Sequence, residues 1–182
     1  MAGPDPLSPT SSYLGDIDTP RLTLRIPSLA DFEDSAIMWA DPAVARFIGG
    51  KPSTREEAWA RLMRYIGHWT ALGYGFWTIR EAATGRFVGE TGFADFKREI
   101  DPPLSAVPEM GWSLAAWAHG QGYASEAVQA ALAWGEAHFG SGRATCIIDP
   151  DNSASMRVAA KAGFRELRRG TYKDGPTVVF ER

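Results

Sequence analysis

Hydrophobic and polar residues change their period from segment to segment along the chain, and these changes predict strands and helices in a mixed order. Arg21–Pro27 alternates with a period of two, which is typical of a half-buried strand, and Leu29–Asp41 takes helical spacing. A Ser/Thr-x-x-Glu pattern over residues 53–57 favours a helix start there, and Gly73 favours its end. The apolar stripe of this second helix consists of Ala58, Leu62, Tyr65 or Ile66, and Trp69.

The middle of the chain is dense in predicted strands. Residues 75–81 and 87–96 are apolar runs joined by the turn residues Thr84 and Gly85, which predicts a hairpin. We expect Lys97–Pro108 to be an exposed loop, because two adjacent prolines cannot donate to a sheet.

Two strand–helix units and a second hairpin complete the predicted order. The strand Glu109–Ala115 precedes the helix Ala124–Phe139. The strand Arg143–Asp149 precedes the helix Ser153–Ala162, and a glycine ends this helix. Residues 165–182 predict a terminal hairpin that closes at a Lys-Asp-Gly turn.

The length of 182 residues and this order of elements predict one α/β domain over residues 13–182, with a mixed sheet and helices on both faces. Residues 1–12 are rich in Pro, Ser, Thr and Gly, so we expect a disordered tail there. The chain start lacks the pattern of a secretory signal, and no stretch approaches about 20 consecutive apolar residues. We therefore expect a cytoplasmic protein that does not associate with membranes.

Charge and cysteine content exclude further classes of protein. A net charge of -3 lacks the basic footprint of a protein whose main partner is nucleic acid. The single cysteine, Cys146, excludes an internal disulfide framework and is expected to be a small buried residue in a strand. Because His68, His119 and His138 lack metal-ligand spacing, no metal site is predicted.

The segment between the predicted strand Glu109–Ala115 and the helix after it carries two glycines, Gly120 and Gly122. A helix N-terminus offers unpaired N–H groups and a partial positive charge, and glycines ahead of it let an anion approach the backbone. This pattern fits a phosphate or a pyrophosphate, although an ordinary strand-to-helix turn would also use glycines. A dinucleotide fingerprint would need a third glycine, and a P-loop would need Gly-Lys-Ser/Thr; neither is present.

The segment His119–Ala124 instead resembles the pyrophosphate-binding motif of the GNAT superfamily of N-acetyltransferases: Gln or Arg, two variable residues, Gly, one variable residue, then Gly or Ala. The first position departs from that motif, because it holds His119. Asp149–Glu166 resembles the second motif of the superfamily, with an Asn and a short helix ending in Gly-Phe, and Glu109–Leu114 resembles its central strand. Thr19–Gly49 and Gly73–Phe93 are similar to the N-terminal half of the RimJ/RimL-like branch.

This resemblance covers roughly residues 18–182 and implies both a fold and an activity. The implied fold is a single α/β domain with a mixed, mostly antiparallel sheet, helices on both faces, and a splayed strand pair at the CoA site. The implied reaction moves an acetyl group from acetyl-CoA to a primary amine of a protein N-terminus or a small molecule, by direct attack on the thioester. It needs no metal, and the protein would be a monomer or a homodimer. The implied CoA contacts are Trp112, Ser113, Leu114, His119, Gly120, Gln121, Gly122, Tyr123, Ala124, Ser125, Asn152 and Arg157.

The resemblance implies that Glu109 is the general base. A glutamate at this place in the branch is expected to accept the proton of the amine, often through water. The alternative is a solvated carboxylate beside a proline, and Asp95, Glu90 and Asp101 are weaker rivals for the same role.

The proton donor to the leaving thiolate is implied to be Ser155. Many members of the superfamily use a tyrosine seven residues after the Asn of the second motif, but that position is Ala159 here. Ser155 could instead bond local backbone, and Asn152 could be an N-cap, a ligand of the pantetheine arm, or both. Arg157 and Lys161 could meet CoA phosphates or form a solvated basic face.

The acceptor is not identified by any motif. Five aromatic residues could line its pocket or could be core volume: Trp39, Phe47, Trp69, Trp77 and Phe93. A non-catalytic acyl-CoA-binding regulatory or sensor module is the alternative to an enzyme. A plain interaction domain is disfavoured, because two distant motifs agree on one ligand.

Overall fold

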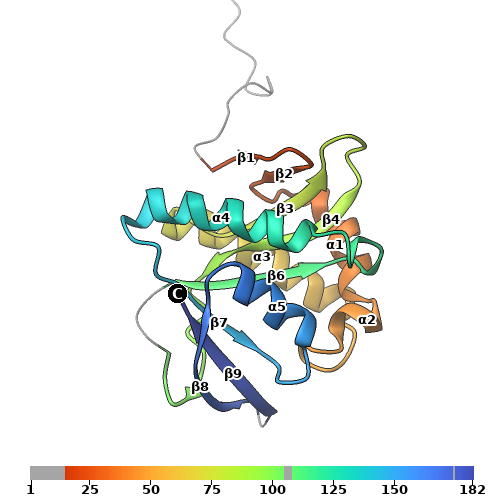
Figure 1. The fold of residues 1–182 in the computed structure, drawn as a ribbon. Coiled ribbons are helices and arrows are strands. Elements are labelled where there is room, and N and C mark those ends of the chain that lie inside the picture. The colour runs from red at the N-terminus through yellow and green to blue at the C-terminus, as the bar shows by residue number, and fades with distance from the viewer. Residues whose placement is uncertain (1–14, 105–107, 174) are drawn as a thin grey trace, which may run out of the picture.

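The computed structural model describes residues 15–104, 108–173 and 175–182 (Figure 1). The predicted tail, residues 1–12, lies outside this part of the chain. The strands are β1 (Ile17–Asp18), β2 (Leu22–Arg25), β3 (Phe76–Glu81), β4 (Phe87–Ala94), β5 (Ile100–Asp101), β6 (Glu109–Leu114), β7 (Thr145–Ile148), β8 (Arg165–Tyr172) and β9 (Gly175–Glu181). The helices are α1 (Phe32–Trp39), α2 (Pro42–Ala45), α3 (Arg55–Leu72), α4 (Tyr123–Phe139) and α5 (Ser153–Lys161), with short 3-10 turns at Leu29–Asp31 and Ala116–Ala118.

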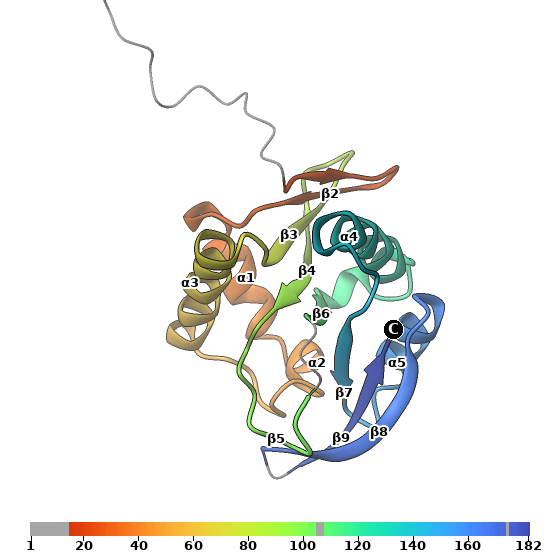
Figure 2. The same ribbon diagram turned by 90° about the vertical axis from the view of Figure 1, so that its left-hand side faces the viewer.

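The strands of the described residues form one sheet in the order β1-β2-β3-β4-β6-β7-β9-β8-β5. Every neighbouring pair is antiparallel except β6 and β7, which are parallel. Figure 2 shows α1 and α3 on one side of the sheet and α4 on the other. The predicted mixed, mostly antiparallel sheet with helices on both faces is therefore confirmed.

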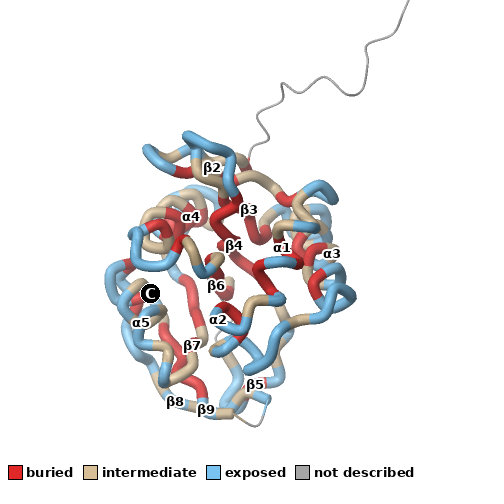
Figure 3. Tube along the Cα trace, turned by 90° about the vertical axis from the view of Figure 1, so that its right-hand side faces the viewer, coloured by how far each residue is buried: buried red, intermediate tan, exposed pale blue. Residues whose placement is uncertain are grey.

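The helix α4 covers the sheet with a stripe of small and aliphatic side chains. Ala127, Val128, Ala131 and Leu132 are 4% exposed or less, and they pack with Met110 of β6 in the main core. Burying such a stripe removes apolar surface from water, which stabilises the fold by about 25 cal/mol for each Å² buried. Buried segments follow β3, β4, β6 and β7 through the centre of the molecule (Figure 3). The position of α4, and so of its N-terminus, is set by this packing.

The predicted capping pattern before α3 is confirmed. Thr54 accepts from the backbone N–H of Glu57 at 3.2 Å, and the Glu57 carboxylate accepts from the backbone N–H of Thr54 at 2.8 Å. Gly73 ends the helix in the left-handed conformation, with φ of 74°. These bonds satisfy backbone groups that a helix end leaves unpaired.

The prediction of an exposed loop over Lys97–Pro108 is wrong in part. Ile100 and Asp101 form β5 and pair with β8, and the Ile100 side chain is buried. The two prolines follow the paired residues, so their missing N–H groups do not interrupt this short ladder. A two-residue strand has no periodicity, which is why the hydrophobic pattern did not predict it.

The aromatic residues considered for an acceptor pocket mainly fill the core. Trp39, Trp77 and Phe93 are 2% exposed or less. Trp69 is partly buried and donates its indole N–H to the Phe76 carbonyl at 2.8 Å. Cys146 lies buried in β7, as predicted, and burial raises the pKa of its thiol.

Glu90 is a buried carboxylate at the centre of β4, on the face covered by α1. Its two oxygens accept from the Ser35 hydroxyl at 2.6 Å and the Trp39 indole N–H at 3.0 Å. Burial raises the pKa of Glu90, although these two hydrogen bonds oppose the shift. Glu90 therefore joins α1 to the sheet through two buried hydrogen bonds.

We expect Glu90→Gln to flatten the pH dependence of stability. A carboxyl whose pKa is raised by folding contributes its full stability below about pH 4.5, and that contribution is lost as pH rises through the folded pKa. The amide does not titrate, and it can accept from Trp39 while donating to Ser35. Urea unfolding from pH 5 to pH 8 should show Glu90→Gln gaining stability relative to the original protein as pH rises.

A constant difference across this pH range would contradict the prediction. Glu90→Ala serves as a comparison, because it leaves the buried Trp39 donor without its acceptor. We expect it to lose about 1–3 kcal/mol at pH 5, a deficit that shrinks as pH rises because alanine does not titrate, and to stay less stable than Glu90→Gln at every pH.

Candidate active site

The parallel strands β6 and β7 separate almost immediately after they meet. Their register contains a single pair, Glu109 with Thr145, and the Thr145 N–H donates to the Pro108 carbonyl at 3.1 Å. No later pair joins these two strands within the described residues. The backbone edge of β6 from Met110 to Leu114 therefore faces a gap in the sheet, which is the splayed strand pair that the sequence resemblance implied.

The glycine turn lies at the open end of this gap, between β6 and α4. Gly120 and Gly122 both have left-handed φ values, 75° and 80°, which residues with a side chain rarely adopt. A Cβ built on Gly120 would meet no atom within 4 Å, so a ligand has room to approach this backbone. Both observations agree with the predicted role of the turn.

The N-terminus of α4 is left uncapped by side chains. Gly122 is the N-cap residue, and no cap hydrogen bond from a side chain is formed there among the described residues. The backbone N–H groups of Tyr123, Ala124 and Ser125 precede the first intrahelical bond, from Glu126 N–H to the Gly122 carbonyl at 3.1 Å. These three predicted CoA contacts would therefore act through backbone amides at the positive end of the helix dipole.

The side chains of the turn bond to the protein itself. His119 Nε2 lies 2.9 Å from the Leu114 carbonyl, so this nitrogen carries the hydrogen. Gln121 donates its side-chain amide to the Trp117 carbonyl at 2.8 Å. His119 thus ties the end of β6 to the turn, which gives it a structural role at the position where the motif has Gln or Arg.

The Tyr123 hydroxyl is already bonded within the protein. It donates to Glu81 at 2.7 Å, which joins the start of α4 to the β3–β4 hairpin. This bond raises the pKa of Tyr123. The pKa of Glu81 is lowered, mainly by the hydrogen bond from Thr84 and also by the bond from Tyr123. Only the backbone of Tyr123 is free to contact a ligand.

The predicted CoA contacts on β6 point to opposite faces of the sheet. Trp112 packs against the core beneath α4, whereas Ser113 is in register with Glu90 and shares its face. The carbonyl of Leu114 already accepts from His119. A ligand in the gap would therefore meet the backbone edge of β6 rather than these side chains.

The second predicted motif begins helix α5, on the far side of the gap. Asn152 is the N-cap and accepts from the Ser155 N–H at 3.0 Å, as the capping interpretation required. Ser155 is half-buried, and its hydroxyl forms no hydrogen bond among the described residues. Arg157 is exposed and donates to Ser153 at 3.4 Å, so it lies along the helix surface.

Glu109 lies at the closed end of the gap and is paired with an arginine. Arg98 Nε is 2.8 Å and 2.7 Å from the two carboxylate oxygens, and the Glu109 side chain is only 8% exposed. Arg98 also donates to the Tyr172 hydroxyl at 2.8 Å. The solvated carboxylate considered from the sequence is therefore wrong, and Glu109 is held in a partly buried network with β8.

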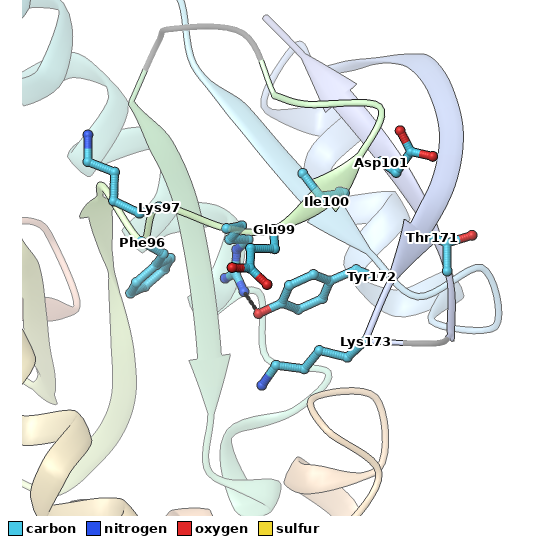
Figure 4. A pocket seen from close by; sticks show the side chains of 9 residues that line it. Phe96, Lys97, Glu99, Ile100, Asp101, Thr171, Tyr172 and Lys173 are labelled. Atoms are coloured by element: carbon cyan, nitrogen blue, oxygen red, sulfur yellow. Dashed lines mark hydrogen bonds between the residues drawn. The ribbon is translucent and has the colours of Figure 1, made fainter.

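A cleft of about 740 Å³ opens beside this network (Figure 4). Figure 4 shows the Tyr172 side chain among the lining residues, with Lys173 and Glu99 beside it. The Tyr172 hydroxyl accepts from Arg98 at 2.8 Å. The volume of the cleft lies within the range of small-molecule sites. The lining residues are Phe96, Lys97, Arg98, Glu99, Ile100, Asp101, Thr171, Tyr172 and Lys173.

The rival carboxylates for the role of base have other surroundings. Glu90 is sealed beneath α1, and Asp95 is paired with Lys97 at 2.7 Å. Asp101 lines the cleft from β5. Glu109 alone of the four combines a place at the closed end of the gap with contact to a cleft residue, Arg98.

Sequence reasoning missed Arg98 and Tyr172. Their positions next to Glu109 depend on β5 pairing with β8, which brings together residues 74 positions apart in the chain. No local pattern signals such a contact. Among the described residues, no group of three or more His, Cys, Asp or Glu side chains lies close enough to hold a metal ion.

Comparison with known proteins matches this arrangement to one family. Residues 21–165 match the family model described as an acetyltransferase (GNAT) domain. The chain is 32% identical to the uncharacterized protein YkkB of Bacillus subtilis over 167 residues, which cover 87% of this chain and 91% of that protein. The alternative of a non-catalytic module gains no support here, because the matched family is one of acetyltransferases.

Solved structures share the fold over nearly the whole chain. A GnaT-family protein from Bordetella pertussis has a TM-score of 0.80 and 30% identity, covering 92% of this chain and 98% of that one. RimL, a ribosomal L7/L12 alpha-N-protein acetyltransferase in complex with coenzyme A, has a TM-score of 0.71 and 19% identity, covering 90% and 94%. At that identity, the likeness to RimL shows a common fold.

Helix α3 offers a matched control for the turn glycines. Gly122→Ala places a side chain at a left-handed φ, which costs about 1–2 kcal/mol, whereas Gly67→Ala occupies open space in a helix and should gain about 0.5–1 kcal/mol. Urea unfolding of the two variants should therefore give shifts of opposite sign. Equal shifts would show that the turn does not depend on the left-handed conformation of Gly122.

Proposed function

The chain belongs to the GNAT family of acetyltransferases, and on that premise we propose that it moves the acetyl group of acetyl-CoA to a primary amine by direct attack on the thioester. The acceptor would be the alpha-amine of a protein N-terminus or the amine of a small molecule. The observation that carries this proposal is the gap between β6 and β7, which has the uncapped N-terminus of α4 at its open end and Glu109 at its closed end.

The dimensions of the gap suit an extended acyl donor. The pyrophosphate would bind at the Gly120–Gly122 turn, where backbone N–H groups and the helix dipole favour an anion. From Leu114 to Glu109 is five residue steps along β6, or about 17 Å. A pantetheine arm laid along this edge would carry the thioester from the turn toward Glu109. Coenzyme A bound to RimL supports this choice of donor.

Glu109 would accept the proton of the attacking amine. Its carboxylate is bonded to Arg98, which lines the cleft together with Tyr172. An amine that enters the cleft would therefore approach the closed end of the gap. Arg98 contacts both carboxylate oxygens, and the amine, or a water bound to it, would share Glu109 with this guanidinium. A base in hydrogen-bond reach contributes typically about 10²–10⁴ in rate.

Ser155 would donate a proton to the leaving thiolate. Its hydroxyl has no partner among the described residues, and the Asn152 cap orders the turn that carries it. A thiol has a pKa of about 8.5, so the thiolate needs less assistance than the amine. We therefore expect Ser155 to matter less than Glu109.

The two acceptor classes differ in how much they need a base. A lysine-type amine with a pKa of about 10.4 is neutral in about one molecule in 2,500 at pH 7, which costs about 4.6 kcal/mol. An N-terminal amine with a pKa of about 7.8 costs only about 1.1 kcal/mol. The dependence on Glu109 is therefore an indicator of the acceptor class.

The activity test is acetyl-CoA-dependent thiol release with a panel of amines that includes N-terminal peptides, amino sugars and polyamines. The proposal expects turnover with at least one acceptor. Binding of acetyl-CoA without turnover of any amine would instead favour the non-catalytic alternative.

With a lysine-type acceptor, we expect Glu109→Gln to lower kcat by about 10²-fold or more, because the amide cannot accept the proton, and with an N-terminal amine the loss should be smaller. Ser155→Ala should have a smaller effect. Glu136→Gln, at an exposed carboxylate on α4, is the control and should leave kcat unchanged. Full turnover in both Glu109→Gln and Ser155→Ala would show that this catalytic assignment is wrong.

A further inference from the structure

Arg21, just ahead of β2, reaches the glycine turn across 100 residues of sequence. Its Nη1 donates to the Gln121 carbonyl at 3.0 Å. Its Nε and Nη2 both lie 2.7 Å from one carboxylate oxygen of Glu126, and its backbone N–H donates to the other oxygen at 3.0 Å. The guanidinium also stacks on the Tyr123 ring, 4.7 Å from its centroid.

The bond to Gln121 sets the direction of the next amide. In a trans peptide the C=O and the following N–H point in opposite directions. Because Arg21 holds the Gln121 carbonyl on its own side, the N–H of Gly122 points to the other side of the turn. Without this bond, the peptide that joins Gln121 to Gly122 would be less restricted, since glycine allows more backbone conformations than other residues.

The bond to Glu126 removes a competitor for the helix N-terminus. Glu126 lies in the first turn of α4, where a carboxylate is attracted to the helix dipole and would repel an incoming anion. Its carboxylate turns toward β1 and β2 instead, where Thr19 donates to it at 2.7 Å. Partial burial opposes ionisation, but the bonds from Thr19 and Arg21 hold the pKa of Glu126 below its ordinary value.

We propose that Arg21 is a positioning residue for the pyrophosphate of the acyl donor, which aligns the Gly122 amide and neutralises Glu126 beside the site. The proposal rests on the proposed acetyl-CoA site and adds a residue that the glycine motif does not contain. Arg21 fixes the conformation of the turn through its contacts with Gln121 and Glu126. His119, at the first position of the motif, is engaged with the end of β6.

The test compares Arg21→Gln with Arg25→Gln. Arg25, four residues later at the end of β2, is a matched control: it is ion-paired with Asp18 at 2.6 Å and donates to two backbone carbonyls, but it does not contact the turn. Calorimetry should show Arg21→Gln weakening CoA binding by about tenfold or more, and Arg25→Gln leaving it unchanged. Equal CoA affinity in Arg21→Gln and the original protein would overturn the proposal.

The acyl donor separates positioning from a general loss of structure. S-acetylpantetheine lacks the pyrophosphate, so kcat/KM with this donor should be the same for Arg21→Gln and the original protein, while kcat/KM with acetyl-CoA falls. A parallel fall with both donors would show a general structural role and contradict the proposal.

A double variant tests the repulsion. If Glu126 competes with the ligand, Glu126→Gln should bind CoA at least as tightly as the original protein, and it should recover part of the loss when combined with Arg21→Gln. Weaker binding in Glu126→Gln, with no recovery in the double variant, would contradict this part of the inference.

Arg21→Lys is the conservative variant at this position. Arg21→Lys keeps the charge but loses the forked donor geometry, so it should also weaken CoA binding, and it replaces Arg21→Gln if that variant does not fold. A protein that binds no CoA even with Arg21 intact would contradict the proposed function itself, whereas CoA binding that is insensitive to Arg21 contradicts this inference alone.

Discussion

The separation of β6 from β7 after a single register pair is the constraint on which the site depends. A sheet normally satisfies the backbone groups of each strand through its neighbours, and an interior strand edge left open needs another partner. Here the opening lies between Glu109, where the strands still pair, and the glycine turn that follows Leu114. The proposed acyl donor would fill the opening with an extended chain, so that the sheet is completed by the ligand.

The elements around the gap hold its two ends. Packing of the α4 stripe on the sheet sets where the helix begins, and the contacts of His119 and Arg21 order the turn before it. At the other end, Arg98 joins Glu109 to Tyr172 and so to β8. The first set of contacts would bind the donor, and the second would meet the acceptor.

Much of this architecture could be predicted from the sequence because its signals are local. The capping bonds of Thr54 and Glu57, the αL glycines of the turn and the Asn152 cap each depend on residues a few positions apart. Contacts made by tertiary structure gave no such signal. Arg98 reaches Tyr172 only because β5 pairs with β8, and Arg21 reaches Glu126 across 105 positions. The environment of Glu109 could not be predicted for the same reason.

The central claim is that CoA lies along β6 with its pyrophosphate at the Gly120–Gly122 turn. Backbone amide NMR shifts during a CoA titration test it most directly. The account predicts the largest shifts at the amides of Gly120, Gly122, Tyr123, Ala124 and Ser125, followed by those of β6. Shifts confined to other surfaces, with these amides unchanged at saturation, would contradict it.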